Sequence, residues 1–478
     1  MLFGYDAVAD DKKRQSPSNK TRSEDKALDR SDRRKAINRV RELWRSFAAA
    51  RWMLNKHCDF VASIHFQSRN EDEVKATSKA AKAELARLDE RIEELVAWWA
   101  RPHNFHASGR HGLYRSLRIA EACRVSDGDM LFQQLSNGKV ATIEGDRLRT
   151  PSMGGSDPRL RKGTWTHGIQ VHDRTGQPLR YAICDRVGSQ GFTLRAIIPA
   201  RHIVHHAWWD FRFDQVRGVS PFLAAVPDLI DAKEAKGYAL SRMKISQFVG
   251  LLVKRASDEP LGTVEGEGET DTEKPFTVNL GQSPFLLDFT DEDDAQWLET
   301  STPSSEFTTF WQVVLAGGMK TLDLPWSFYD EAYTNFFGSR AALNIYLASA
   351  VRKREDVAET ADRLFRWRMG LFLLEGELTL PRYLSIPELR GEWMPTGLPW
   401  WNPIQEVKAD KMAVEMGTAT VPGICKARGD EARDLVEQQL SFESYRRRRY
   451  AEESVPLPGE APPLPAREPA GDVYGPES

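Results

Sequence analysis

The chain has 478 residues, of which 41% are hydrophobic and 28% are charged, and its formal net charge is −3. This length allows about three domains, or one elongated subunit of several parts, with enough apolar side chains to bury a core. The near-neutral charge excludes a global basic field, so no tight clamp on nucleic-acid phosphates is expected.

Cysteine usage and the N-terminal sequence bear on the compartment. Cys58, Cys123, Cys184 and Cys425 lack the spacing of a metal site or a disulfide framework, so we expect free thiols in a reducing cytoplasm. Residues 1–35 contain no apolar signal core, and no window approaches the ~20 apolar residues of a membrane span. We therefore expect a protein made in the cytoplasm without membrane association.

The first half of the chain predicts a mixed α+β domain that ends near Phe213. Residues 1–33 are rich in Asp, Lys, Arg and Ser, which predicts a disordered arm. Helical periodicity follows at Ser31–Cys58, Glu71–Ala100 and Tyr114–Val125, with a strand-like alternation at Phe60–Gln67. Six short β-type runs separated by turn signals come next, at Met130–Leu135, Val140–Ile143, Ile169–His172, Tyr181–Cys184, Leu194–Ile198 and Ile203–Trp208.

Two features of this domain have a functional and a structural interpretation. The basic first part of the helix at Ser31–Cys58 is compatible with nucleic-acid contact, but a solvated face is favoured. His202, His205 and His206 are candidate metal ligands. However, His205 and His206 are expected on opposite faces of a strand, and no carboxylate or cysteine lies at a matching offset. Ordinary packing and hydrogen bonding are favoured over a metal site.

A helix, an insert and a second helix lie between Arg217 and Pro325. Ser220 and Pro221 suit a helix start, and Pro227 predicts a kink or a delayed start, so the first helix is expected at about 228–249. The insert, 251–303, contains strand-like pieces at Leu251–Lys254, Phe276–Leu280 and Phe285–Phe289. The second helix is expected at Ser304–Leu324. This order predicts a two-helix stalk that carries a small cap.

The insert is strongly acidic. Its carboxylates occur in two groups, Glu265, Glu267, Glu269, Asp271 and Glu273, and then the consecutive Asp291, Glu292, Asp293 and Asp294 at an expected loop–helix start. Clustered carboxylates can hold catalytic metal ions, which leaves open a metal-dependent DNA-processing hydrolase that uses the cluster near Asp291. A solvated surface for basic partners is favoured.

The rest of the chain predicts a loop and further helices. Residues 325–338 are aromatic and are expected to form an ordered loop, followed by a long helix at Ser339–Leu374. A loop rich in Trp and Pro is expected at Trp393–Pro403, then helices at Ile404–Met416 and Glu431–Ala451, and a disordered tail from Val455. The sequence has no Gly-Lys-Ser/Thr phosphate loop, Gly-x-Ser-x-Gly elbow, His-Glu-x-x-His or Cys-x-x-Cys, which favours a structural protein over an enzyme.

Four stretches occur in an order that resembles a known family. They are Gly168-Ile169-Gln170 with Asp173 and Tyr181; Ile198 to His205 followed by Arg217-Gly218-Val219-Ser220-Pro221; Asn335 to Leu343; and Trp401 to Asp410, which continues to Thr420. Over roughly residues 35–450 this set resembles the portal proteins of tailed double-stranded-DNA phages, of the lambda type.

The resemblance implies an α+β, mainly α, portal fold with a wing, a helical stem, a small β-rich clip and a helical crown. The implied parts are a disordered arm at 1–33, the wing at 34–219, stem helices at 220–250 and 304–324, the clip at 251–303, the tunnel loop at 325–338, a long wing helix at 339–381, the crown at 382–453 and a disordered tail at 454–478. The tunnel loop would present Trp326, Tyr329, Tyr333, Asn335, Phe336 and Arg340 to DNA, and the acidic residues of the clip would dock terminase and the adaptor.

The same resemblance implies a function and a set of partners. The chain would form a dodecameric ring at the unique capsid vertex, located in the virion and, during assembly, in the host cytoplasm. Its partners would be itself, double-stranded DNA in the channel, the terminase large subunit, a head–tail adaptor, and the major capsid and scaffold proteins. No enzyme activity, cofactor, metal or membrane is implied. A capsid scaffold without a channel is a further alternative.

Overall fold

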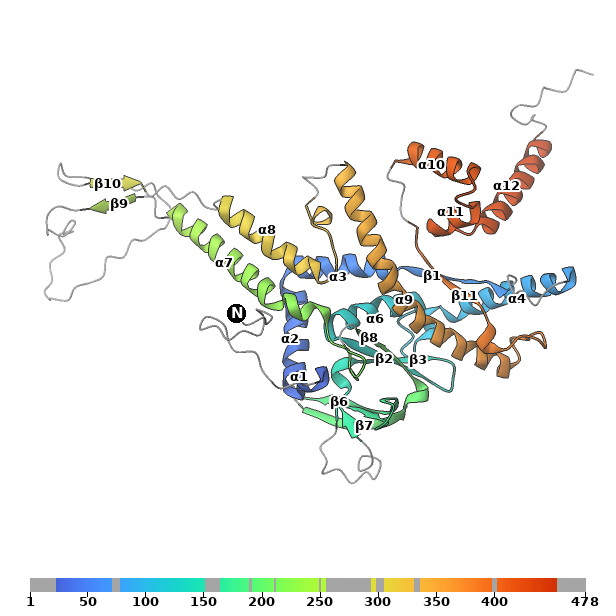
Figure 1. The fold of residues 1–478 in the computed structure, drawn as a ribbon, viewed down its shortest axis with the longest axis horizontal. Helices are drawn as coiled ribbons and strands as arrows, with labels where there is room; N and C mark the ends of the chain where they lie inside the picture. Colours follow the sequence, from blue (N-terminus) through green and yellow to red (C-terminus); the bar gives the residue numbers. More distant parts are fainter. Residues whose placement is uncertain are drawn as a thin grey trace, which may run out of the picture. The chain divides into compact units, whose positions relative to one another are not determined.

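The computed structural model describes residues 23–70, 78–150, 164–188, 191–209, 212–248, 251–254, 294–297, 305–330, 336–397 and 402–453. They belong to two compact units, whose elements are labelled in Figure 1. The first unit comprises the chain up to residue 62 together with residues 94–388, and the second comprises residues 63–93 and the chain from 389 onward. Residues 63–93, which fall within the range expected for the wing, belong to the second unit.

The N-terminal helices correct two expectations. α1 (Glu24–Ala27) and α2 (Arg30–Ser46) are folded, and Asp29 caps α2 by accepting hydrogen bonds from the backbone N–H groups of Ser31 and Asp32. The arm expected over 1–33 is thus folded from residue 23, and residues 1–22 lie outside the described residues. The single helix expected at Ser31–Cys58 is instead α2 and α3 (Ala48–Val61), separated at the extended backbone of Phe47, whose side chain is buried.

Two antiparallel sheets form the β part of the first unit. β2 (Asp129–Gln134) lies between β3 (Val140–Glu144) and β8 (Ile203–Ala207). The second sheet has the order β4 (Thr164–Thr166), β5 (Ile169–Val171), β6 (Pro178–Val187) and β7 (Gly191–Pro199). Leu131, Ile143, Leu148, Ile169, Tyr181, Ile183 and Ile203 join both sheets in one apolar core. The six predicted strands are confirmed.

Helices and short 3-10 turns complete the first unit. α5 (Pro102–Phe105) and α6 (Leu113–Asp127) precede the sheets, and α4 (Lys79–Trp99) contributes only its last turns, because its residues 79–93 belong to the second unit. Residues 71–77 of the helix expected from Glu71 lie outside the described residues. The 3-10 turns are η3 (Gly145–Arg147), η5 (Ala200–His202), η6 (Pro221–Ala225), η7 (Trp326–Phe328) and η9 (Ile386–Glu388). No helix in the described part of the chain is long and apolar enough to cross a membrane.

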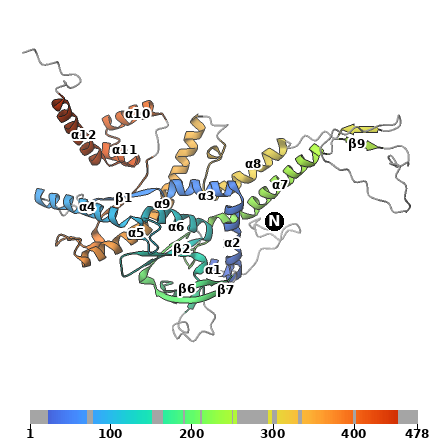
Figure 2. The same cartoon turned by 180° about the vertical axis from the view of Figure 1, so that it is seen from behind.

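A helical hairpin follows the sheets. η6 leads directly into α7 (Val226–Phe248), so Pro227 lies in the first turn and the delayed helix start is confirmed. β9 (Leu251–Lys254) pairs antiparallel with β10 (Asp294–Trp297), and α8 (Ser305–Lys320) returns beside α7, as Figure 1 and Figure 2 show from opposite sides. Asp294 therefore begins a strand rather than a helix. The predicted strands at 276–280 and 285–289 lie outside the described residues.

The long helix α9 (Phe336–Glu375) begins three residues earlier than predicted. The expected loop over 325–338 is correspondingly shorter, because Phe336 to Gly338 belong to the first turn of α9 and Trp326–Phe328 form η7. No described residue of this loop is fully exposed: Pro325 to Asp330 are all partly buried. The prediction of an ordered loop is confirmed for this part.

The second unit joins two segments that are far apart in the sequence. β1 (Ile64–Ser68) pairs antiparallel with β11 (Gly391–Pro395), which places Trp393 in a strand and not in the expected loop. Phe66 packs on Trp393 with ring centroids 5.1 Å apart, and this long-range pairing decides the local structure. α10 (Pro403–Glu415), α11 (Val421–Ala427) and α12 (Ala432–Glu452) follow, and α11 was not predicted. The tail expected from 454 lies outside the described residues.

Candidate functional site

The α7–α8 hairpin packs tightly at its base and is exposed further out. Leu229 and Ala232 of α7 and Leu315 and Met319 of α8 are fully buried. The indole N–H of Trp311 donates to the Ala232 carbonyl at 3.3 Å, which fixes the register of the two helices. Further along, large apolar side chains face solvent: Tyr238, Leu240, Phe310 and Val313, with exposed fractions of 73%, 48%, 54% and 67%. These side chains offer apolar surface on the outer part of the hairpin.

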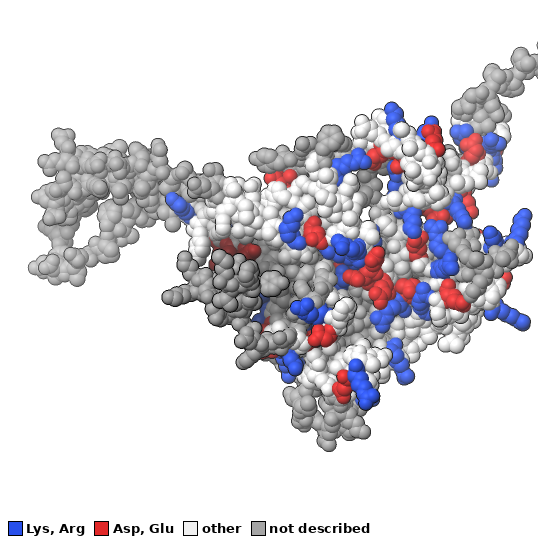
Figure 3. Space-filling model, viewed as in Figure 1, with Lys and Arg blue, Asp and Glu red and all other residues white. Residues whose placement is uncertain are grey.

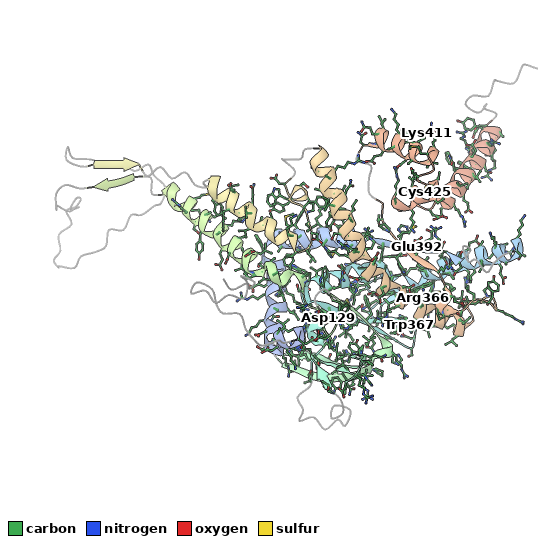
Figure 4. The ribbon with its side chains drawn as sticks, viewed as in Figure 1. Asp129, Arg366, Trp367, Glu392, Lys411 and Cys425 are labelled. Atoms are coloured by element: carbon green, nitrogen blue, oxygen red, sulfur yellow. The ribbon has the colours of Figure 1, made fainter. Side chains whose placement is uncertain are left out.

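The segment that leads into the hairpin is fixed by Arg217. Its guanidinium is fully buried and donates to both carboxylate oxygens of Asp129, one of them at 2.7 Å. It also donates to the carbonyls of Leu148, His167 and Gly145 at 3.0, 2.9 and 2.8 Å. One side chain thus joins the first sheet, the loop before β5 and the start of the hairpin. Figure 4 labels Asp129 in the first unit.

The same network extends through one further carboxyl group, a histidine and a second arginine. Burial alone raises the pKa of Asp129, but Arg217 and the hydrogen bond from His205 at 3.2 Å outweigh it and hold the pKa of that carboxyl far below its ordinary value. Asp25 accepts from the backbone N–H of Val216 at 2.7 Å. Arg33 donates to the Gly218 carbonyl at 2.6 Å. The Arg217 and Asp129 charges are therefore paired and hydrogen-bonded, as burial requires, whereas Nε and Nη2 of Arg33 have no hydrogen-bond partner among the described residues.

A second buried network is centred on Glu121 of α6. It accepts from His57 of α3 at 2.6 Å and from His206 of β8 at 3.0 Å, while Arg124 donates at 2.8 and 3.0 Å. Burial raises the pKa of Glu121, but Arg124 and the two histidines hold it well below the ordinary value. Burial lowers the pKa of His57 and His206 despite these hydrogen bonds, so both rings are neutral. The other nitrogen of His206 bonds Thr360 of α9 at 2.9 Å.

These networks decide the role of the three candidate histidines. His205 and His206 point to opposite sides of β8, to Asp129 and Glu121 respectively, as predicted. His202 is exposed beside Arg201. Within the described ranges, no group of three His, Cys, Asp or Glu residues is arranged to hold a metal ion. The hydrogen-bonding interpretation is confirmed for His205 and His206.

The aromatic loop after α8 packs on α3 and α9. Tyr329 lies edge-on to Trp52 and beside Trp326, each at a centroid distance of 5.2 Å. Phe328 stacks on Phe60 at 5.6 Å and contacts Tyr346 of α9 at 5.3 Å. The loop is therefore held by aromatic contacts within one chain.

The end of α8 is fixed to α9 by polar contacts. Asp323 accepts from Lys353 at 2.8 Å and from Ser349 at 2.6 Å, and Lys353 also donates to the Leu322 carbonyl. Burial raises the pKa of Asp323, but the Lys353 and Ser349 bonds outweigh it and lower the pKa. The hairpin, the loop and the first half of α9 are thereby joined.

The structure brings together only part of the predicted site. Trp326, Tyr329 and Arg340 are partly buried, and Phe336 lies in the first turn of α9, but Tyr333 and Asn335 lie outside the described residues. Of the acidic set, Asp294 lies in β10, and Glu265, Glu267, Glu269, Asp271, Glu273, Asp291, Glu292 and Asp293 lie outside the described residues.

Sequence reasoning missed the two buried networks. Arg217 and Asp129 are 88 positions apart, and Glu121 and His206 are 85 apart. Arg217 was part of a noted motif, but nothing in the sequence identifies Asp129 as its partner. On the face drawn in Figure 3, basic and acidic side chains are interspersed over the described surface, in agreement with the near-neutral net charge.

Comparison with known proteins gives one family match. The model of the family described as "Phage portal protein, lambda family" matches residues 11–347, which is more than half of the chain. No curated protein matches. Among solved structures, the neck of an empty GTA particle computed with C6 symmetry matches at 12% identity and a TM-score of 0.47, covering 80% of this chain and 90% of that one. The virion of a native gene transfer agent particle matches at 13% identity and a TM-score of 0.44, with 81% and 90% covered.

Proposed function

Because the chain belongs to the lambda family of phage portal proteins, we propose that it forms a dodecameric ring at the unique capsid vertex, with a central channel for double-stranded DNA. Portal proteins are structural, non-enzymatic components of the virion, and so is this chain. The family match argues against a metal-dependent hydrolase near Asp291. The family match over residues 11–347 carries the proposal, since it includes both hairpin helices and the aromatic loop.

The hairpin supports a stem role. We assign α7 and α8 to the stem, the insert 251–303 to the clip, and the loop after α8 to the tunnel loop. In a closed ring each subunit uses two different faces, one toward each neighbour. The exposed Tyr238, Leu240, Phe310 and Val313 on the outer hairpin provide apolar surface for such contacts.

The remaining parts follow the same assignment. The wing would comprise most of 34–219 and the long helix of 339–381, and the crown would lie within 382–453. DNA would meet the part of the tunnel loop around Tyr333, Asn335, Phe336 and Arg340, since Trp326 and Tyr329 are partly committed to contacts with Trp52 and with each other. Terminase and the head–tail adaptor would dock on the acidic clip, where carboxylates attract basic partner surfaces. Capsid and scaffold proteins would surround the ring.

Imaging and native mass measurement of the purified chain test the ring. We expect particles with a central hole and a mass of about twelve subunits. A chain that stays monomeric under all assembly conditions would refute the proposal. Val313→Asp should reduce assembly because it places a charge in an apolar contact. Thr308→Asp, on an exposed position of the same helix, is the matched control and should assemble normally.

A further inference from the structure

A large cavity lies in the first unit, apart from the hairpin. Its volume is about 800 Å³, within the range of ligand-binding pockets. β5, β6, β8 and α9 contribute to its wall. Part of the wall is apolar, with Ile169, Val171, Tyr181, Ile203 and Val216 among its residues. Pro178, Leu179 and Arg201 also line it and are exposed, so the cavity is open to solvent.

The charged groups of this cavity are unbalanced. Arg180, Arg201 and Arg363 line it together with Asp356 and Glu359. Asp356 is bound by Arg124 at 2.6 Å. Within the described part of the chain, Arg180 and Arg363 make no ion pair. The cavity therefore offers three guanidinium groups against one carboxylate that is not already paired, which favours an anionic occupant.

A buried acceptor in the wall also lacks a partner. Gln215 is only 6% exposed and lines the cavity, and its side-chain nitrogen donates to the carbonyls of Trp208 and Arg217. Its oxygen Oε1 is buried without a hydrogen-bond partner among the described residues. Because solvent does not reach this oxygen, it would gain a partner from an occupant only if the Gln215 side chain turned toward the cavity.

The chain enters the first unit beside this cavity. Asp25 accepts from the backbone N–H of Val216 at 2.7 Å, and Val216 belongs to the cavity wall. The backbone carbonyl of Asp25 accepts from His167 at 2.6 Å, so the entry point is fixed. Residues 12–22 precede it, and eleven residues can span at most roughly 36–40 Å. Residues 1–11 are therefore within reach of the cavity.

The sequence of residues 1–11 matches the cavity. Leu2, Phe3 and Tyr5 are apolar or aromatic, and Asp6, Asp10 and Asp11 are acidic. We propose that residues 1–11 bind in this cavity of their own chain, with Phe3 and Tyr5 against the apolar wall and the aspartates at Arg180 and Arg363. The basic Lys12, Lys13 and Arg14 that follow remain outside. The inference does not depend on ring formation.

Photo-crosslinking of the full-length chain tests this proposal. A benzophenone amino acid replaces Phe3, and mass spectrometry maps the crosslinked peptides. We expect crosslinks to peptides that contain residues 176–181 or 199–207, at the mass of a single chain. The same probe at Ser16 is the control for proximity along the chain and should give a clearly lower yield of these crosslinks. Absence of crosslinks from position 3, or crosslinks elsewhere, refutes the proposal, and so does a covalent dimer, which would place the segment in a second copy.

Charge reversal supplies a second, independent measurement. Arg363 is exposed, so Arg363→Glu should leave the fold intact while weakening the docking equilibrium roughly tenfold, as expected for loss of a charge-assisted bond. Arg352→Glu, at another exposed position of α9, is the matched control. Combining Arg363→Glu with Asp10→Arg and Asp11→Arg should restore the crosslink. An unchanged yield in Arg363→Glu, or no rescue by the swap, contradicts the charge pairing.

Discussion

Replacement of Arg217 by methionine should be among the most destabilising single changes in the first unit. The side chain makes five hydrogen bonds, two to Asp129 and three to backbone carbonyls, and is fully buried. Arg217→Met keeps much of the volume but leaves the Asp129 carboxylate buried with only His205 beside it. Loss of one partner of a buried ion pair costs about 3–5 kcal/mol, and three orphaned carbonyls place this case toward the upper end.

Urea unfolding at fixed protein concentration measures how much Arg217→Met lowers the free energy of unfolding. Arg195→Met, which removes an exposed arginine 3.7 Å from Asp185, is the control and should change the free energy of unfolding by at most about 0.5 kcal/mol. The double variant Asp129→Leu with Arg217→Met should recover part of the loss, because no isolated charge remains. A loss below about 1 kcal/mol for Arg217→Met would refute the view that this pair fixes the base of the hairpin.

The difference in free energy of unfolding between the native chain and Arg217→Met should change with pH, and the direction of that change tests the assignment. In the native chain the pKa of Asp129 lies below its unfolded value, so its contribution is complete above about pH 4 and is lost only as pH falls further. Without Arg217, burial dominates and raises this pKa. The deficit of Arg217→Met should therefore shrink as pH falls through the raised pKa toward the unfolded value of about 3.9. A deficit that grows over this range contradicts the assignment.

Three further predictions concern local features of the same unit. Burial lowers the pKa of His57 and His206, so the free energy of unfolding of the first unit should be at its full value above the unfolded pKa of about 6.5. As pH falls below 6.5, the free energy of unfolding should decrease by up to about 1.4 kcal/mol per pH unit for each ring. An unchanged urea midpoint between pH 7.5 and 5.5 would disprove this. Gly128→Ala should lower the melting temperature far more than Gly176→Ala. Both glycines have positive φ, but a Cβ at Gly128 would lie 2.5 Å from the Gly218 carbonyl oxygen, whereas a Cβ at Gly176 would meet no atom within 4 Å. Ser220→Ala should lower the free energy of unfolding in urea by about 1–2 kcal/mol. The Ser220 hydroxyl accepts from the Phe222 backbone N–H at the start of η6 and donates to the Val125 carbonyl at 2.6 Å. Equal stability of the variant and the native chain would exclude the capping role.

Local periodicity in the sequence predicts the positions of most helices and strands. α6 and α9 have long apolar stripes, and the strands from β2 to β8 alternate between turn signals, so the expected elements lie within a few residues of the observed ones. α11 was missed although its signals are present: Thr420 caps it and Pro422 lies in its first turn. The flanking Gly417 and Gly429 favour a loop, so the sequence pattern alone does not predict this helix.

The other differences arise from contacts between distant residues. Nothing near Phe47 marks a helix break, because neither glycine nor proline is present; the side chain is buried, and its packing sets the change of direction. Trp393 has neighbours typical of a loop, yet pairing with β1 makes it a strand residue. The Arg217–Asp129 pair likewise depends on topology. Sequence patterns report local preferences, whereas these features are decided by tertiary contacts.

The pairing of β1 with β11 has a consequence for biosynthesis. Ser68 is made 323 residues before its partner Gly391, and the intervening chain contains most of the first unit. At typical rates of about 5–20 residues per second, β1 waits roughly 16–65 s without its one partner strand, β11. Nascent chains that stop before residue 391 cannot complete the second unit, so a translation pause upstream of that point leaves an open strand available for aggregation or chaperone binding.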